Sequence, residues 1–369
     1  MLGSSSRFLD GLRASHTVLA RATVVDYLGA SEQYEVVDGS ITIDGRGNIW
    51  RNATLTLMHD DVRKLSKIDV TDKVVLEYGM RYFDHAIEWI TVGTFWVQEI
   101  VQQYPAQTVQ VTLFDVGTKV EDYRLVTPYV PISNAGSRMN NYEAVEDLLR
   151  IVDASIPVNF DAGLATGSAV PEGTVFTGSR WDALQTFAKA MGAVVHGDEK
   201  GHWRVHKISG IGSPSWQVNA GDGGVLVSAA SVRSRREQFN AVPVRWETPG
   251  GGGLLFLTDG DPNSPTRWGG PFGKRPAEET SIGTITSESE ATAAAVALLT
   301  QYKGFSRSVS FSAIANPLLE PLDIVRLHLP GEQVEDHIID SVNYQIGDGV
   351  MSCETRLVRT PTATTGVEA

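Results

Sequence analysis

Two segments far apart in this chain carry the same three-strand pattern. The first copy comprises residues 72–77, 95–100 and 109–115, and the second comprises residues 323–328, 337–342 and 351–358. Each copy opens with Asp-x-Val-x-Leu, at Asp72 and at Asp323, and continues with a hairpin at nearly the same offset. Such internal similarity predicts two similar β domains, and it indicates a chain that presents the same surface twice. The question therefore becomes one of assembly rather than of reaction.

The first copy lies within a mostly antiparallel β domain, which we expect over residues 17–115. Strand patterns cover residues 17–26, 35–37, 40–44 and 53–58, and residues 44–48 (Asp-Gly-Arg-Gly-Asn) form a strong turn signal. Residues 1–16 read as a polar N-terminal arm with three apolar anchors, Phe8, Leu9 and Leu12.

Helical periodicity appears after Asp115 and indicates an inserted α/β domain over residues 116–208. Residues 141–152 and 179–192 each place apolar side chains on one helical face. Ser179 is a good N-cap, and Gly192 can end the second helix. A hairpin pattern over residues 193–207 completes the domain.

Strand patterns resume afterwards, and residues 209–247 with 286–359 are expected to form the second β domain. A helix begins at Ser287, where Glu290 completes a capping box. Residues 248–285 are rich in Gly, Pro and Asp and predict a loop-rich insertion, and residues 360–369 predict a flexible tail. The predicted class is α+β, mainly β, with two similar β-barrel domains of tube type.

The composition is acidic. The 369 residues carry a formal net charge of −13, with a pI of about 5.1. Gripping nucleic acid needs clustered Lys and Arg, so this chain would repel DNA rather than hold it, although acidity also simply aids solubility. The single cysteine, Cys353, excludes a disulfide framework within the chain. The sequence has neither a secretory signal nor a bilayer-spanning apolar run, which predicts folding in a cytoplasm.

No motif favours catalysis, a metal or a cofactor. His196, His202 and His206 lie around a predicted hairpin whose acids are typical of a solvated turn. Residues 259–263 resemble the start of a calcium loop and residues 269–274 a phosphate loop, but each lacks required positions. Carboxylate pairs such as Glu320 with Asp323 read as solvated faces. Trp216 and Trp268 lie in predicted loops and are the candidate partner contacts.

Four segments in a characteristic order make the chain resemble the baseplate or tail-tip hub proteins of tailed bacteriophages. The resemblance is strongest to minor tail proteins of phages that infect actinobacteria. These segments are residues 74–115 with their Val-Val-Leu-Glu-Tyr opening, residues 180–205, residues 236–244 and residues 315–325. Together they span most of residues 17–358.

The resemblance implies a structural virion protein at the tail tip, without catalytic residues. It implies a homotrimer whose six β-barrel domains match a sixfold tail tube and distal tail ring on one side and a threefold tip on the other. The implied partners are the distal tail protein, the tape measure protein, the tail tube and other tip or fibre proteins, with DNA passing through the lumen. The residues also leave open a particle-borne carbohydrate-active enzyme, suggested by the tryptophans and carboxylates, and a host-receptor binding module.

Overall fold

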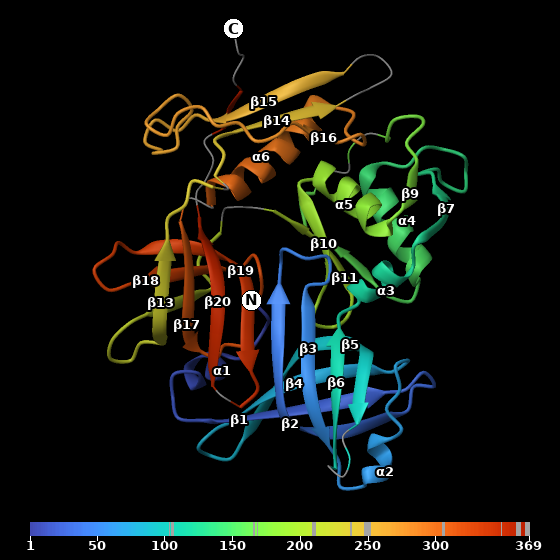
Figure 1. Ribbon diagram of the computed structural model, residues 1–369, viewed down its shortest axis with the longest axis vertical. Coiled ribbons are helices and arrows are strands. Elements are labelled where there is room, and N and C mark those ends of the chain that lie inside the picture. The colour runs from blue at the N-terminus through green and yellow to red at the C-terminus, as the bar shows by residue number, and fades with distance from the viewer. Residues whose placement is uncertain are drawn as a thin grey trace.

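A twelve-stranded sheet dominates this mainly β protein, and two smaller bodies lie beside one end of it (Figure 1). The computed structural model describes residues 1–102, 104, 107–164, 167, 169–208, 212–236, 238–246, 252–304, 307–347, 349–358 and 363–365. Within these residues, no helix is long and apolar enough to cross a membrane.

The first β unit contains six strands: β1 (Thr17–Val25), β2 (Ser31–Asp44), β3 (Arg51–Met58), β4 (Lys73–Arg81), β5 (Ile87–Gln102) and β6 (Thr108–Phe114). Their hydrogen-bonded order is β1-β4-β5-β6-β3-β2, and β2 pairs with β1 again. Buried and half-buried side chains alternate along β3, as expected for a sheet with one face on a core. The short helix α2 (Val62–Leu65) contributes Leu65 to the same core.

Residues 1–16 are more ordered than the predicted polar arm. Ser5 caps helix α1 (Ser6–Gly11), and its hydroxyl accepts a hydrogen bond from the backbone N–H of Phe8. Phe8 and Leu12 are buried in the main core. The apolar anchors therefore dock the segment onto the first β unit.

The second β unit also has six strands: β12 (Trp216–Asn219), β13 (Leu226–Val232), β17 (Ser308–Ile314), β18 (Ile324–His328), β19 (Glu335–Gln345) and β20 (Val350–Leu357). Their order is β12-β18-β19-β20-β17-β13. This unit differs from the first in two ways. Strand β12 runs parallel to β18, whereas β1 runs antiparallel to β4, and among the described residues no ladder joins β12 to β13.

The region predicted as an inserted α/β domain forms a separate body with its own core. Its helices are α3 (Gly117–Asp122), α4 (Asn141–Val152) and α5 (Arg180–Ala190), and its strands are β7 (Leu125–Tyr129), β8 (Val158–Phe160), β9 (Phe176–Gly178), β10 (Ala193–Gly197) and β11 (Trp203–Lys207). The two helices predicted from periodicity are present, with Asn140 and Ser179 as their N-caps.

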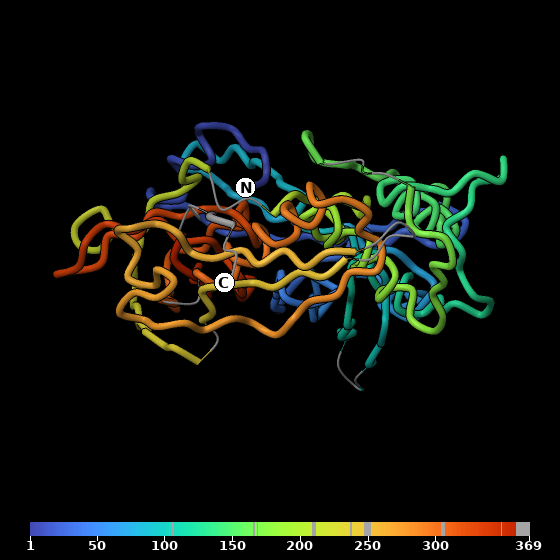
Figure 2. The backbone as a smooth tube through the Cα atoms, turned by 90° about the horizontal axis from the view of Figure 1, so that it is seen from above, coloured from blue at the N-terminus to red at the C-terminus, as the bar shows by residue number. Residues whose placement is uncertain are grey.

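A third body lies across the top of the molecule and departs from the predicted domain division. It contains β14 (Ala241–Trp246), β15 (Gly253–Asp259), β16 (Thr280–Ser281), β21 (Ala363–Thr365) and helix α6 (Glu288–Gly304). Figure 2 shows β14 and β15 as neighbouring traces that run over the molecule, with the α/β body at one end.

The apolar stripe of α6 packs on β14 and β15 rather than on the twelve-stranded sheet. Residues 241–246 and α6 therefore belong with part of the predicted loop insertion, because a helical stripe in the sequence does not specify which sheet it covers. In the predicted flexible tail, residues 363–365 pair with β15, and its remaining residues lie outside the described chain.

Candidate assembly site

The two β units are related strand by strand, and irregularities in pairing fix the correspondence. Gln98 is an extra residue in β5 opposite β6, and Asp340 is an extra residue at the matching place in β19 opposite β20. Val37 in β2 and Val227 in β13 form a second matching pair of bulges. Bulges are specific features of a strand pair, so two coincidences support a true structural repeat.

The Asp residue that opens each sequence copy also makes the same hydrogen bonds in both units. The carboxylate of Asp72 accepts a hydrogen bond from the backbone N–H of Asp69 at 2.9 Å, and the carboxylate of Asp323 accepts one from that of Glu320 at 2.8 Å. The carbonyl groups of Asp72 and Asp323 then accept from Val97 and Ile339. The repeated Asp is therefore a turn-capping residue that starts a strand.

Eight strands of the two units form one continuous sheet in a tandem order (Figure 1). The order is β5-β6-β3-β2 followed by β19-β20-β17-β13, and the second four strands correspond to the first four in the same sequence. The junction, which we call the seam, is the antiparallel pairing of residues 40–44 of β2 with residues 341–345 of β19. The last strand of one unit thus pairs with the first strand of the next.

This order leaves a matching pair of free edges at the two ends of the sheet. Strand β13 corresponds to β2, and within the described chain its ladder is with β17 alone. Residues 99–102 of β5 correspond to the seam residues of β19, and the described ladders pair them only with β6. Strand β13 has the sequence Leu-Val-Ser-Ala-Ala-Ser-Val, without charge or proline. Edge strands that avoid association usually carry charged residues or proline, which hinder pairing with another strand. Strand β13 has neither and is therefore suited to pairing.

One cross-strand pair distinguishes the seam from the free edges. At the seam Thr42 lies opposite Asn343, whose side-chain amide donates to the Thr42 hydroxyl at 2.6 Å. The corresponding residues at the free edges are Val232 and Val101, which are 54% and 40% exposed. The hydrogen-bonded polar pair of the seam thus corresponds to two exposed valines at the free edges. These valines would bury each other if the two edges paired.

Arg51 holds the three parts of the structure near the seam together. Its buried guanidinium group donates to the carboxylate of Glu320 in the second β unit and to the carbonyl of Gly197 in the α/β body. Burial lowers the pKa of the Arg51 guanidinium, against the raising influence of Asp115. The ring of Trp50 stacks on His196, with 3.7 Å between ring centres.

Asp115 ends the first β unit beside this junction. Its carboxylate accepts backbone hydrogen bonds from Trp50, Arg51 and Gly117 at 2.8 to 3.0 Å. Burial nevertheless raises the pKa of Asp115 to about 6, because desolvation outweighs these donors. Sequence reasoning missed this junction, since Glu320 reads as a solvated acid until its distant partner is known.

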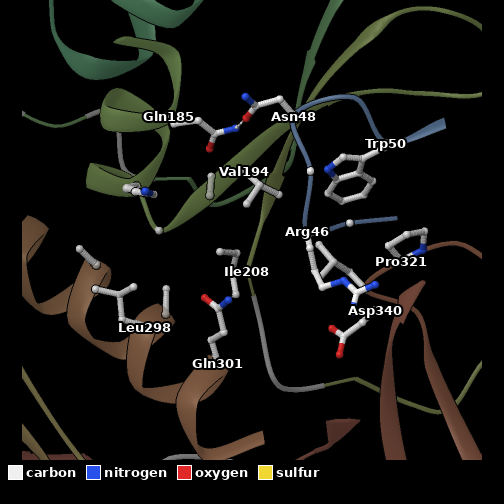
Figure 3. Close-up of a pocket in the computed structure, with 18 of the residues that line it drawn as sticks. Arg46, Asn48, Trp50, Gln185, Val194, Ile208, Leu298, Gln301, Pro321 and Asp340 are labelled. Atoms are coloured by element: carbon white, nitrogen blue, oxygen red, sulfur yellow. Dashed lines mark hydrogen bonds between the residues drawn. The ribbon is translucent and has the colours of Figure 1, made fainter. Parts of the chain in front are cut away.

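A cavity of about 300 Å³ opens between the seam and helices α5 and α6. Figure 3 shows Trp50, Pro321, Arg46 and Asp340 on one side of it and Leu298 on the other. The Arg46 guanidinium is engaged by Asp44 and Glu354, and Asp340 pairs with Arg356. Three of the charged groups that line the cavity, Arg46, Asp340 and Arg356, are thus engaged in ion pairs, and the cavity lies at the junction between bodies.

The two residues predicted from the sequence as partner contacts, Trp216 and Trp268, lie in different environments. Trp216 does not lie in a loop, because it opens β12 and its side chain is buried in the main core. Trp216 is therefore unsuited to a surface contact in this conformation, and the prediction that it lies in a loop was wrong. Trp268 is half-buried in the predicted loop region, where it contacts Phe256 edge-on and lies under Lys274. Its role as a partner contact stays a prediction.

Two of the other segments weighed from the sequence can be placed in the fold. Among the described residues, no cluster of three or more His, Cys, Asp or Glu is arranged to hold a metal ion. Asp259, in the segment that resembles a calcium loop, is buried and pairs with Lys303 at 2.8 Å. Its other oxygen accepts from Ser264 and Thr266.

Neither a protein-family model nor a curated protein matches the sequence of this chain. Solved structures do resemble it over nearly its whole length. The tail protein from Neisseria meningitidis MC58 has a TM-score of 0.64 at 12% identity, covering 92% of this chain and 96% of its own. The 43 kDa tail protein of prophage MuSo2 from Shewanella oneidensis has a TM-score of 0.58 at 14% identity, covering 92% and 98%.

The prophage tail protein gp18 from Listeria monocytogenes EGD-e has a TM-score of 0.57 at 11% identity, covering 91% of this chain and 94% of its own. At such low identities the likeness concerns the fold, and it agrees with the resemblance inferred from the order of the sequence segments. The chain has the fold of phage tail proteins.

Proposed function

We propose that this chain is a structural protein of a phage tail, the baseplate or tail-tip hub, and that it assembles as a homotrimer. The observation that carries the proposal is the tandem order of the eight-stranded sheet with its two matching free edges. The two β units act as two tube-type barrel modules in each chain. Three copies then present six modules.

The proposed trimer repeats between chains the pairing found within each chain. Residues 231–234, which comprise the end of β13 and the two residues after it, would pair antiparallel with residues 99–102 of β5 in the next copy, as β2 pairs with β19. Transferring the seam register places Val232 opposite Val101 and Ser231 opposite Gln102. Such a head-to-tail interface generates a closed ring when its rotation closes, and each added contact removes two exposed edges.

A ring of this kind can join a sixfold tail tube and distal tail ring to a threefold tip and form part of the DNA exit channel. Its proposed neighbours are the distal tail protein, the tape measure protein, the tail tube and other tip or fibre proteins. The protein would fold in the host cytoplasm and reside at the tail tip of the virion. No described arrangement of residues favours the carbohydrate-active or receptor-binding alternatives over this role.

The native mass of the assembly and its position in particles test the proposal. Light scattering on the purified protein, together with labelling in intact particles, should find a trimeric ring at the tail end. A chain that is monomeric when isolated and trimeric in particles also supports the proposal, with neighbouring proteins driving assembly. A monomer that is absent from particles would overturn it.

A further inference from the structure

Arg51, whose ion pair crosses the seam, has a counterpart in the second β unit. The matched bulges align β3 with β17, so that Asn52 and Ser308 lie opposite corresponding residues of β2 and β13. The residue before each of them is an arginine, Arg51 in the first unit and Arg307 in the second. Both side chains are buried, with 1% and 8% of their surfaces exposed. The repeat therefore includes a buried cation at the start of the two corresponding strands.

The two guanidinium groups differ in their hydrogen bonds. Nη2 of Arg51 donates to Glu320 across the seam. Arg307 instead uses Nη1, which donates to Glu332 at 3.4 Å and to Glu335 at 3.1 Å. Within the described chain, Nε and Nη2 of Arg307 are buried and have no hydrogen-bond partner. The nitrogen that crosses the seam in Arg51 is thus unpartnered in Arg307.

Arg307 lines a pocket of about 440 Å³ whose charge is opposite to that of the whole chain, which is −13. Among the described residues of its lining, two further cations, Arg233 and Arg235, stand against a single carboxylate, that of Glu335. Gln238 lines the same pocket, is 4% exposed, and finds no partner for its side-chain nitrogen in the described chain. Buried donors without acceptors cost free energy, and a carboxylate can accept from two nitrogens of one guanidinium at once. The pocket is therefore suited to an acidic group.

The repeat identifies the acid that would enter this pocket in the proposed ring. Glu320 and Asp69 each stand three residues before the turn-capping Asp, and each donates its backbone N–H to the carboxylate of that Asp. They therefore hold the same position in the two units. Asp69 is exposed, and within the described chain its carboxylate accepts only from Thr71, through Oδ1. Its Oδ2 is thus available to another donor.

We infer that Arg307 and the pocket around it bind the carboxylate of Asp69 of the next copy, an inference that rests on the proposed function. The step that relates one β unit to the next takes the ion pair of Arg51 with Glu320 to this contact. The two unpartnered nitrogens of Arg307 then have an acceptor. Val70, which is 58% exposed in the single chain, enters with Asp69 and is covered by apolar side chains of the pocket lining.

The same pair distinguishes the two free edges from each other. Arg233 and Arg235 follow β13 directly, so the pocket lies at the β13 edge. The segment of Asp69 lies beside β5, because the carbonyl of Asp72 accepts from the backbone N–H of Val97. Two β13 edges paired with each other, or two β5 edges, would leave the buried guanidinium without its acid. The ion pair therefore favours the head-to-tail contact that a ring requires.

An exchange of one exposed acid tests the contact without disturbing the core of the chain. Asp69→Asn removes the charge, and Asp69→Glu supplies the side chain that stands at position 320 in the seam. Asp60→Asn is the matched control, because Asp60 is exposed in the same segment between β3 and β4. Sedimentation of the purified protein measures the concentration at which the trimer dissociates. Asp69→Asn should raise that concentration at least tenfold, since a buried arginine loses its acceptor. Asp69→Glu and Asp60→Asn should leave it unchanged.

A double-mutant cycle shows whether the two groups touch each other. Arg307→Gln should also weaken the trimer, and the double variant with Asp69→Asn should dissociate no more readily than Arg307→Gln alone, because the second change removes a partner already lost. Urea unfolding establishes that each variant folds. Additive effects of the two changes would overturn the contact. If Arg307→Gln does not fold, the comparison of the Asp69 variants with Asp60→Asn decides the matter.

The outcomes separate this contact from the proposed function. Asp69→Asn trimers as stable as those of the unsubstituted protein, or equal weakening by Asp60→Asn, would overturn the contact and leave the trimer standing. Absence of a trimer of the unsubstituted protein, both in solution and in particles, would overturn both. If the isolated chain is monomeric and the particles contain a trimer, incorporation into particles replaces the dissociation measurement. Asp69→Asn should then be incorporated at least tenfold less than Asp60→Asn, and equal incorporation would overturn the contact.

Discussion

Arg51 and Glu320, which come from different β units, form an ion pair in which the guanidinium group is almost completely buried. The same guanidinium also donates to Gly197 of the α/β body. A single side chain therefore fixes the relative placement of all three parts beside the seam. Since the seam residues supply the template for the proposed contact between copies, this junction matters for assembly as well as for stability.

Replacing Arg51 with methionine should lower the free energy of unfolding by about 3 to 5 kcal/mol, because a partly buried carboxylate loses its partner. Arg46→Met is the matched control, since its guanidinium is half exposed and its ion pairs lie at the surface. That change should cost less than about 1 kcal/mol. Urea unfolding of both variants measures the two losses in the free energy of unfolding. Equal losses would contradict the claim that the Arg51 junction stabilises the fold more than a surface ion pair does.

Lys303→Met should destabilise the third body, where the ion pair with Asp259 is fully buried. The expected loss is about 3 kcal/mol, because the carboxylate stays buried with neutral donors alone, the hydroxyls of Ser264 and Thr266 and the backbone N–H of Asp261. Hydrogen exchange should show the increased opening in residues 259–268. Arg245→Met, in an exposed pair of the same body, is the control, and similar exchange in the two variants would refute the account.

The Lys119–Asp153 pair should make stability depend on acid pH. Burial acts to raise the pKa of Asp153, but Lys119 at 2.6 Å and Ser155 outweigh it, and the pKa falls to about 2. The stabilisation is therefore present above about pH 4 and is lost as the pH falls toward 2. Lys119→Met should cost about 1 to 2 kcal/mol at pH 6, and its stability should converge with that of the unsubstituted protein near pH 2. A difference that is constant with pH would exclude this ionic origin.

Val232→Lys should weaken the contact between copies and leave the fold of each chain intact. A lysine on a free edge adds a charge that must be desolvated when another strand pairs there. Val227→Lys is a close control, because Val227 is 63% exposed on the same strand but lies outside the predicted pairing. Sedimentation should show a trimer for the control and smaller species for Val232→Lys. Trimers from both variants would argue against β13 as the contact.

Much of the fold follows from the sequence because its signals are local. The helices over residues 141–152 and 180–190 have clear caps and periodicity, and the structure contains both. The paired Asp-x-Val-x-Leu openings predicted the repeat, and the structure extends it to matching turn caps and bulges.

What the sequence could not supply depends on contacts between distant residues. Glu320 reads as solvated until the fold brings Arg51 to it, and α6 carries no sign that it covers β14 and β15. Trp216 was predicted in a loop because its strand is only four residues long. The tandem order of strands is likewise a property of sheet register, which pattern alone does not fix. The uncharged run of β13 was the one local signal of the free edge, and its meaning required the topology.

The central claim is that β13 of one copy pairs with β5 of the next in the register of the seam. The most direct test is disulfide trapping with Val101→Cys and Val232→Cys, whose side chains would face each other at about 4.5 to 5.5 Å between Cβ atoms. Cys353 is buried and lies away from both edges, so it can remain in place. Mild oxidation of particles or of the purified trimer should give covalently linked trimers from this pair. The pair Ile100→Cys with Val232→Cys, shifted by one residue and therefore on opposite faces, should give none. Absence of cross-links from the first pair in assembled trimers, or equal cross-linking by both pairs, would contradict the proposed contact.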